Sequence, residues 1–169
     1  MIGIAMADQD ITKEILNFLF DYKNGELYWK FSLSCKSPKG TIAGSVKKDN
    51  YRRIGINKKV YLAHRLIFMM FHGYFPKFVD HIDGNKLNNY IENLREVTHA
   101  ENMKNQKISI SNTSGYKNVS WNKKQKKWRV ALKINYKDKE IGYFKDIELA
   151  DLVAQEARDK YHGKFARNF

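Results

Sequence analysis

Asp80, His81 and Asn102 carry side chains that are suited to hydrolysing a phosphodiester bond. Such hydrolysis needs a base that deprotonates water and a divalent cation that neutralises charge on the phosphate and on the leaving oxygen. Histidine suits the base, because its unperturbed pKa lies near neutrality. Carboxylate and amide oxygens suit a hard cation such as Mg²⁺, which keeps positions open for substrate oxygens. The three residues are therefore a candidate one-metal hydrolytic site.

A predicted hairpin carries the first two of these residues. Residues 78–82 form an expected strand, the Asp-Gly-Asn sequence at 83–85 is a strong turn signal, and residues 93–97 form a returning strand. Asp83 and Asn85 are interpreted as turn formers rather than as ligands.

A helix follows the hairpin and carries Asn102. The sequence Thr98-His99-Ala100-Glu101 matches a capping box, in which the first and last residues satisfy each other's backbone N–H groups. Asn102 then lies one turn into the helix, where it can face the strand with Asp80 and His81. His99 is expected to be structural or a minor phosphate contact, and Asn105 is the alternative ligand if the helix register differs.

The Asp80-His81 pair, the Asn93-Leu94 pair and the helical Asn102 resemble the HNH family of nucleases, most closely its phage and intron-encoded homing branch. The resemblance implies a ββα-metal motif in which Asp80 and Asn102 bind the metal and His81 activates water. It also implies that Asn93 braces the loop between the strands. Asn stands at the third position instead of the His of zinc-associated members, which favours Mg²⁺ or Mn²⁺ over a nitrogen-liganded transition metal.

The charge distribution indicates a nucleic-acid substrate. The chain has 31 Lys and Arg against 18 Asp and Glu, with a net charge of +13. Residues 31–79 carry 10 basic and 1 acidic side chains and residues 106–145 carry 11 and 2, whereas residues 80–105 carry 3 and 5. Two basic arms therefore flank a slightly acidic centre, as expected if the arms hold the DNA backbone and the centre binds a cation.

Other bulk features set the expected context. Cys35 is the single cysteine, so an intramolecular disulfide and a Cys-rich zinc site are excluded. No apolar stretch approaches the 18 residues that would suggest a membrane span. We expect an intracellular phage protein that acts in a bacterial host, with neither a membrane partner nor a small-molecule cofactor.

The region 1–77 is expected to be a small mixed α/β unit. Apolar residues at helical spacing predict a helix from residue 11, and strands are predicted at 26–31, 41–47 and 51–61, with turns at 24–25 and 57–58. An apolar helix over 63–71 should end at Gly73. Its beginning, His64-Arg65-Leu66, resembles the region that precedes the motif in phage HNH proteins.

Basic side chains of this region are candidate DNA contacts. Arg52 and Arg53 on a strand, and Arg65 on the apolar helix, are predicted to contact phosphates, which position a protein without specifying sequence. His64 is expected to be a cap or packing residue, because a lone histidine at the start of an apolar helix is more often structural.

The remainder of the chain predicts a linker and a second module. Residues 107–114 are rich in Ser, Asn and Thr, and residues 115–169 show three strands followed by a helix from about 146 to 162. In the second strand Trp128, Val130 and Leu132 alternate with polar residues, so one face should be apolar. That face is expected to pack on the helix through four side chains: Leu149, Leu152, Val153 and Ala157.

The segment from Tyr116 to Val119, Trp128, the Ile141–Phe144 segment and the closing Asn168-Phe169 resemble the DNA-binding domain of the plant ethylene-response-factor (Apetala-type) family. The resemblance implies a three-stranded antiparallel sheet that lies in the DNA major groove. The plant arginines are replaced here, so their base preference is not transferred. The predicted DNA contacts of this module are Lys117, Ser120, Asn122, Lys123, Lys126, Arg129 and Lys133.

Together these features predict an α+β protein with an HNH core at 78–106 between an N-terminal region and a C-terminal DNA-binding module. The predicted function is site-directed endonucleolytic cleavage of double-stranded DNA, leaving a 5′ phosphate. A regulator that keeps the motif without cleaving, and an RNA-processing nuclease, are the alternatives. Nicking or double-strand cutting, and monomer or dimer, stay open.

Overall fold

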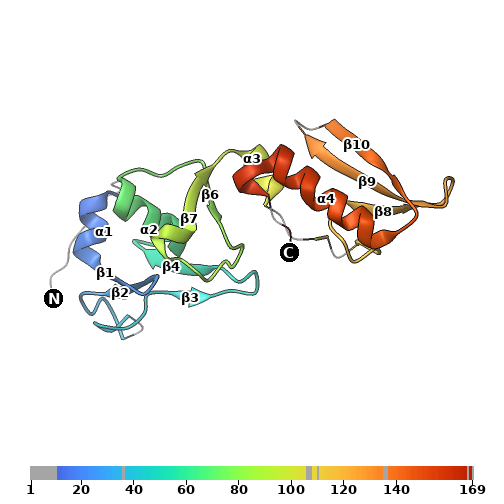
Figure 1. The fold of residues 1–169 in the computed structure, drawn as a ribbon. Coiled ribbons are helices and arrows are strands. Elements are labelled where there is room, and N and C mark those ends of the chain that lie inside the picture. The colour runs from blue at the N-terminus through green and yellow to red at the C-terminus, as the bar shows by residue number, and fades with distance from the viewer. Residues whose placement is uncertain are drawn as a thin grey trace. The chain divides into compact units, whose positions relative to one another are not determined.

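The computed structural model describes residues 11–35, 37–105, 108–109, 111–134, 137–166 and 168. It divides into two compact units, Met1–Glu96 and Val97–Phe169 (Figure 1). The division falls inside the segment 78–106, which the sequence analysis treats as one motif. The predicted four-part organisation by function stays a prediction, and its linker at 107–114 lies partly outside the described residues.

The first unit begins with a helix and a hairpin. Helix α1 (Lys13–Leu19) is capped by Thr12 and leads directly into β1 (Phe20–Lys23), which pairs antiparallel with β2 (Glu26–Trp29). The predicted turn at Asn24 and Gly25 is confirmed, with φ values of 51° and 76°. The sequence analysis missed β1, because its Phe-Asp-Tyr-Lys sequence also continues the helical pattern before it.

A second sheet and a buried helix complete the frame. Strands β3 (Ser45–Val46), β4 (Arg52–Ile56) and β5 (Lys59–Leu62) form an antiparallel sheet, and α2 (Ala63–His72) follows β5 at once. The predicted strand over 41–47 is therefore too long. Helix α2 ends as predicted at Gly73, whose φ of 83° is accessible to glycine at little cost.

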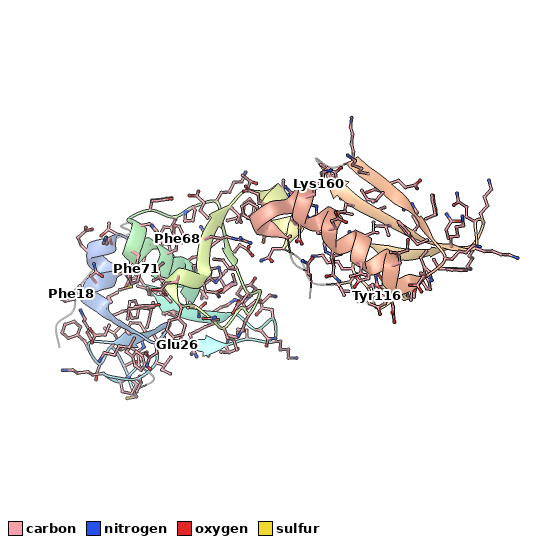
Figure 2. All side chains as sticks on the ribbon, viewed as in Figure 1. Phe18, Glu26, Phe68, Phe71, Tyr116 and Lys160 are labelled. Carbon is pink, nitrogen blue, oxygen red and sulfur yellow. The ribbon has the colours of Figure 1, made fainter. Side chains whose placement is uncertain are left out.

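The core of the first unit lies between α1, α2 and the two sheets. Figure 2 labels Phe68 on α2, which belongs to this core, and Phe18 on α1 and Phe71 on α2, which are exposed. Each fully buried large apolar side chain contributes roughly 1.5–3 kcal/mol relative to its exposed state. The fully buried apolar members are Leu16, Phe20, Leu27, Ile54, Leu66 and Ile67.

The predicted strand, loop, strand and helix are all present after α2. Strand β6 (Phe78–His81) pairs with β7 (Leu94–Val97), and a short 3-10 helix η1 (Ile91–Asn93) precedes β7. Helix α3 (His99–Lys104) belongs to the second unit. Its predicted capping box is confirmed, since Thr98 and Glu101 accept from each other's backbone N–H groups.

The second unit contains the predicted three-stranded antiparallel sheet packed on one helix. Strands β8 (Val119–Asn122), β9 (Lys127–Ile134) and β10 (Lys137–Phe144) lie in the order β10-β9-β8. Helix α4 (Ile147–His162) covers the sheet, and the 3-10 helix η2 (Gly163–Phe165) follows. The α+β class is confirmed, while the likeness to the plant DNA-binding family stays a prediction.

The face of α4 that packs on the sheet differs from the prediction. Leu149 and Leu152 are 49% and 63% exposed, whereas Ala150, Ala154 and Ala157 are buried. Large apolar side chains of the sheet, including Trp128 and Phe144, already fill the interface, so the small alanines allow the helix to approach closely. The prediction that Leu149 and Leu152 belong to the core is therefore wrong.

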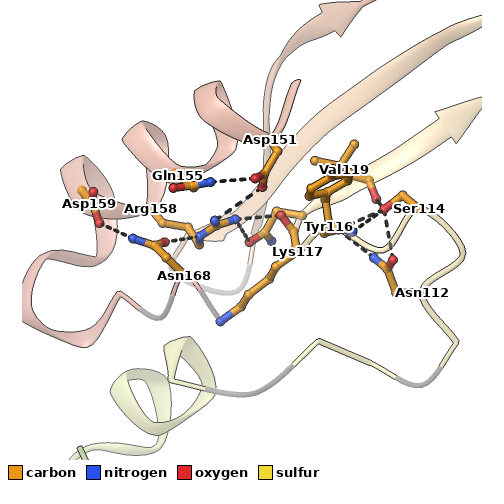
Figure 3. A network of polar contacts seen from close by, with 11 residues as sticks. Asn112, Ser114, Tyr116, Lys117, Val119, Asp151, Gln155, Arg158, Asp159 and Asn168 are labelled. Carbon is orange, nitrogen blue, oxygen red and sulfur yellow. Dashed lines mark hydrogen bonds and ion pairs between the residues drawn. The ribbon is translucent and has the colours of Figure 1, made fainter. Parts of the chain in front are cut away.

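A fully buried arginine joins the helix to the rest of the second unit. Arg158 donates to the backbone oxygen of Lys117 at 2.7 Å and to Oδ1 of Asn168 at 2.7 Å, and lies 3.9 Å from Asp151 (Figure 3). The figure also shows the neighbouring contacts of Ser114, which order the segment before β8.

Candidate active site

Strand β6 places two neighbouring titratable side chains in buried positions. Asp80 and His81 are 8% and 4% exposed, and successive residues of a strand project to opposite faces. The Asp80 carboxylate is held by Arg95 of β7, whose Nε and Nη2 donate to Oδ2 at 3.0 and 2.8 Å. Two charge-assisted hydrogen bonds to one oxygen fix the orientation of this carboxylate.

His81 lies in a cluster of rings and amides. Its Nε2 is 3.0 Å from Oδ1 of Asn89, and its ring meets that of His64 edge-on with centroids 4.9 Å apart. The Tyr51 ring lies 6.3 Å from it. Burial lowers the pKa of His81, opposed in part by the bond to Asn89 and by the nearby Asp83. The neutral imidazole, which can accept a proton, is therefore favoured.

His64 supports this cluster from α2. Its side chain is 5% exposed and makes no cap hydrogen bond at the helix start, where Leu62 is the N-cap. Its ring also contacts Tyr51, with centroids 5.3 Å apart. Burial, and then the neighbouring His81, lower the pKa of His64 to about 3. Of its two predicted structural roles, packing is confirmed and capping is not.

Side-chain hydrogen bonds order the loop between β6 and β7. Asn93 accepts from the backbone N–H of Asp83 at 3.1 Å, and its Nδ2 donates to Asp83 Oδ1 and to the Asn88 carbonyl at 3.0 and 2.7 Å. Burial would raise the pKa of Asp83, but the bonds from Asn85, Asn88 and Asn93 outweigh it and lower that pKa. Asp83 and Asn85 are turn formers, as predicted.

The remaining predicted motif residues belong to the second unit. Asn102 lies on α3, where its backbone N–H donates to the Thr98 carbonyl at 3.0 Å. Asn105 follows the helix as its C-cap and is buried. The structure thus pairs Asp80 with Arg95 and His81 with Asn89 on neighbouring positions of β6, while the metal-ligand role of Asn102 stays a prediction.

The three arginines predicted to contact phosphates in the first unit are engaged by protein acceptors. Arg52 pairs with Glu26, with Nε and Oε2 2.8 Å apart, and Arg53 pairs with Asp49. Arg65 donates to the carbonyl oxygens of Pro76 and Lys77 at 2.9 and 3.3 Å, which braces the chain before β6. Their contact with DNA stays a prediction.

Most of the side chains predicted to contact DNA in the second unit are exposed to solvent. Arg129 is partly exposed and donates to Glu140 at 2.9 Å. Lys117 differs from the others because its Nζ donates to the Lys104 carbonyl at 3.2 Å. Asn122 accepts from the backbone of Gln125 and so shapes the turn after β8. The exposed members of the set are Ser120, Lys123, Lys126 and Lys133.

Sequence reasoning missed three residues of the cluster: Tyr51, Asn89 and Arg95. Asn89 stands in an Asn-rich loop in which any amide would be interpreted as a turn former. The alternation in the returning strand gives a weak signal for Arg95, because it places this charge on the face opposite to Leu94 and Glu96. Tyr51 has no local signal and is identified only by its ring contacts.

The donor chemistry near Asp80 fits a hard cation. Within the described ranges, no group of three or more His, Cys, Asp or Glu side chains is arranged to hold a metal ion. The carboxylate of Asp80 is an oxygen donor of the kind that Mg²⁺ takes together with water and substrate phosphate oxygens.

Comparison with known proteins identifies the family. Residues 61–104 match the family described as HNH endonuclease. Protein 3.8 of Escherichia phage T7 is 38% identical over 108 residues, which cover 62% of this chain and 87% of that protein. The DNA endonuclease I-HmuI of Bacillus phage SP01 is 44% identical over 88 residues, covering 48% of this chain and 47% of I-HmuI. The chain belongs to the HNH family of homing DNA endonucleases.

Two further proteins are similar to this chain. The putative HNH homing endonuclease YosQ of the SPbeta prophage in Bacillus subtilis is 57% identical over 78 residues, covering 42% of this chain and 43% of YosQ. A solved structure titled "DNA binding and cleavage by the HNH homing endonuclease I-HmuI" matches with 33% identity and a TM-score of 0.40, covering 70% of this chain and 68% of that one. The HNH relatives named here are thus phage or prophage proteins. HNH nucleases generally use a divalent metal. No helix in the described part of this HNH protein is long and apolar enough to cross a membrane.

Proposed function

We propose that this chain hydrolyses phosphodiester bonds of duplex DNA at directed sites, with His81 as the general base. The observation that carries the proposal is the buried pair on β6. His81 is kept neutral by burial, and its neighbour Asp80 is held by two hydrogen bonds from Arg95. A positioned neutral base beside an oriented carboxylate is the arrangement that metal-assisted hydrolysis requires.

Asp80 and Asn102 are the residues that would hold a divalent metal, with Mg²⁺ preferred and Mn²⁺ as the alternative. Both offer oxygen donors, and Mg²⁺ is commonly bound through one or two carboxylates, waters and substrate phosphates. When bound, such a cation offsets negative charge on the phosphate and on the departing oxygen.

The side chain of His81 supports the proton transfer of the reaction. Its imidazole accepts a proton from the attacking water as the water oxygen bonds to phosphorus, and the bond from phosphorus to the 3′ oxygen breaks. The 3′ oxygen departs with the electron pair of that bond and takes a proton from solvent, so the products are a 5′ phosphate and a 3′ hydroxyl. The lowered pKa of His81 keeps the base in its accepting form near neutral pH.

Binding of the DNA backbone is assigned mainly to the exposed lysines of the second unit. Lys123, Lys126 and Lys133 lie in the β8–β9 turn and on β9, where no neighbouring core restricts them. Lysines of this kind neutralise phosphates and release counterions, which gives binding without strong base preference.

Cleavage of a supercoiled plasmid in Mg²⁺ tests the proposal. We expect the parent chain to nick or linearise the plasmid and His81→Ala to be slower by about 10²–10⁴-fold, because a positioned general base contributes a factor of that order. Binding of duplex DNA should be retained in the variant. His72→Ala, at the exposed end of α2, is the matched control and should cut like the parent.

Three outcomes would overturn parts of the proposal. Equal cutting by the parent and His81→Ala would remove His81 as the base. Tight, salt-sensitive binding by a parent chain that leaves the plasmid intact would favour a regulator that retains the HNH motif as a scaffold. Faster cleavage of structured RNA than of duplex DNA would favour an RNA-processing nuclease.

A further inference from the structure

Asn89 is a polar side chain at the centre of the first unit, and it contacts the proposed base directly. It is 1% exposed, and its Oδ1 lies 3.0 Å from Nε2 of His81 in a buried hydrogen bond. Because an amide oxygen accepts and does not donate, Nε2 must carry the proton in this bond. In the neutral imidazole the lone pair then resides on Nδ1.

The N-terminal hairpin holds Asn89 in place. The hydroxyl of Tyr22 on β1 donates to the Asn89 carbonyl at 3.4 Å and accepts from the backbone N–H of Ile91 at 3.0 Å. The turn glycine of the same hairpin, Gly25, lies so close that a Cβ there would be 3.0 Å from the Tyr90 nitrogen and 3.3 Å from the Asn89 carbonyl carbon. Segments more than sixty residues apart in the chain therefore position this one amide.

The amide of Asn89 is retained at an energetic cost. In the described part of the chain its buried Nδ2 has no hydrogen-bond partner. An unsatisfied buried donor of this kind is unfavourable, and an apolar side chain of similar size would avoid the penalty. An apolar replacement would lack the amide oxygen and therefore its hydrogen bond to His81.

We infer that Asn89 is a positioning residue that holds the His81 imidazole in the tautomer with its proton on Nε2 and its lone pair on Nδ1. The inference rests on the base role proposed for His81, and it assigns Nδ1 as the atom that takes the proton from water. The edge-on contact with the His64 ring limits rotation of the same imidazole. Together the two contacts set both the tautomer and the direction of the lone pair.

Nitrogen-15 NMR of the full chain measures the tautomer directly and independently of cleavage. The chain has five histidines, and comparison with His81→Ala assigns the His81 signals. At alkaline pH, where the imidazoles are neutral, the parent should show a protonated Nε2 and an unprotonated Nδ1. Asn89→Asp keeps an acceptor and should retain this tautomer, whereas Asn89→Leu should give a mixture of the two.

Plasmid cleavage then links the tautomer to catalysis. Asn89→Leu should lower kcat by about tenfold to a hundredfold with KM unchanged, as is typical when the partner that orients a functional histidine is lost. Asn17→Leu, at an exposed position of α1, is the control for the amide-to-leucine change and should behave like the parent.

The two measurements separate failure of this inference from failure of the proposed function. A parent spectrum with the proton on Nδ1, or an unchanged His81 tautomer in a folded Asn89→Leu, overturns the role of Asn89 whatever the chain cleaves. An altered tautomer with unchanged kcat overturns its positioning role in catalysis. If His81→Ala cuts like the parent, the base assignment fails, although the tautomer result still stands.

Discussion

In the first unit, arginine side chains donate to protein acceptors, whereas in the second unit most of the predicted basic contacts extend into solvent. Arg95 holds Asp80, Arg52 pairs with Glu26, and Arg65 braces the carbonyl groups before β6. Lys123 and Lys126 of the β8–β9 turn and Lys133 of β9 are exposed instead.

Guanidinium and ammonium groups suit these two settings for different reasons. A guanidinium presents several donors in a fixed plane, so it can orient a carboxylate or a loop. An exposed ammonium keeps its rotational freedom and meets a phosphate wherever the backbone lies. In the first unit the arginines hold carboxylates and backbone carbonyl groups, whereas the second unit exposes lysines, which we propose to contact the DNA backbone. Arg158 is the buried exception in the second unit.

Replacing Arg158 should produce the largest effect and tests this exception. Arg158→Leu leaves the Lys117 carbonyl and Asn168 without their buried donor, so we expect a loss of about 3–5 kcal/mol in the stability of the second unit. Hydrogen exchange resolved by residue should show faster exchange in β8, β9 and α4, and unchanged exchange in α2.

Lys160→Ala, an exposed change on the same helix, is the control for this experiment. If Arg158→Leu were as stable as the parent, buried arginine contacts would not hold the second unit together. Equal loss of protection in α2 would show that the two units do not unfold separately.

Acid should weaken the first unit through His64. Its pKa is lowered from the ordinary 6.5 to about 3 by burial, so the unfolded chain binds this proton first as the pH falls. The contribution of neutral His64 to the stability of the folded unit is therefore fully present above about pH 6.5 and is lost as the pH falls toward 3. For one proton, the unfolding free energy changes by at most about 1.4 kcal/mol per pH unit.

Denaturant titrations across this window, with His64→Phe as the variant, measure the contribution. The variant should show a shallower dependence of unfolding free energy on pH than the parent. His72→Phe, at the exposed end of α2, should keep the parent slope. Identical slopes for the parent and His64→Phe would mean that His64 is not held neutral in the folded unit.

Local sequence signals located most of the elements, although not β1, and did not predict the contacts between them. The capping box located the start of α3, and the glycine signals located the turn of the β1–β2 hairpin at Gly25 and the end of α2 at Gly73. The buried face of α4 was misassigned, because its leucines and alanines both repeat at helical spacing and the bulk of the opposing sheet decides between them.

The contacts around His81 were also not predictable from local sequence. Asp80 and His81 are adjacent in sequence, so their chemistry was predictable. Asn89 meets His81 from a loop whose backbone also contacts Tyr22 and lies close to Gly25, far earlier in the chain. Contacts of this kind depend on tertiary packing that no local pattern encodes.

The smallest expected effect is on the salt dependence of DNA binding, which distinguishes exposed lysines from arginines that are paired within the protein. Replacing Lys123 and Lys133 together by Gln should reduce the slope of log binding constant against log salt by about two, since each lost phosphate contact removes about 0.9. Arg52→Gln should leave that slope unchanged, because this guanidinium pairs with Glu26. Titrations of a labelled duplex at several salt concentrations measure both. A reduced slope for Arg52→Gln would assign a DNA contact to the first unit, and the two units would then not differ in how their basic side chains are used.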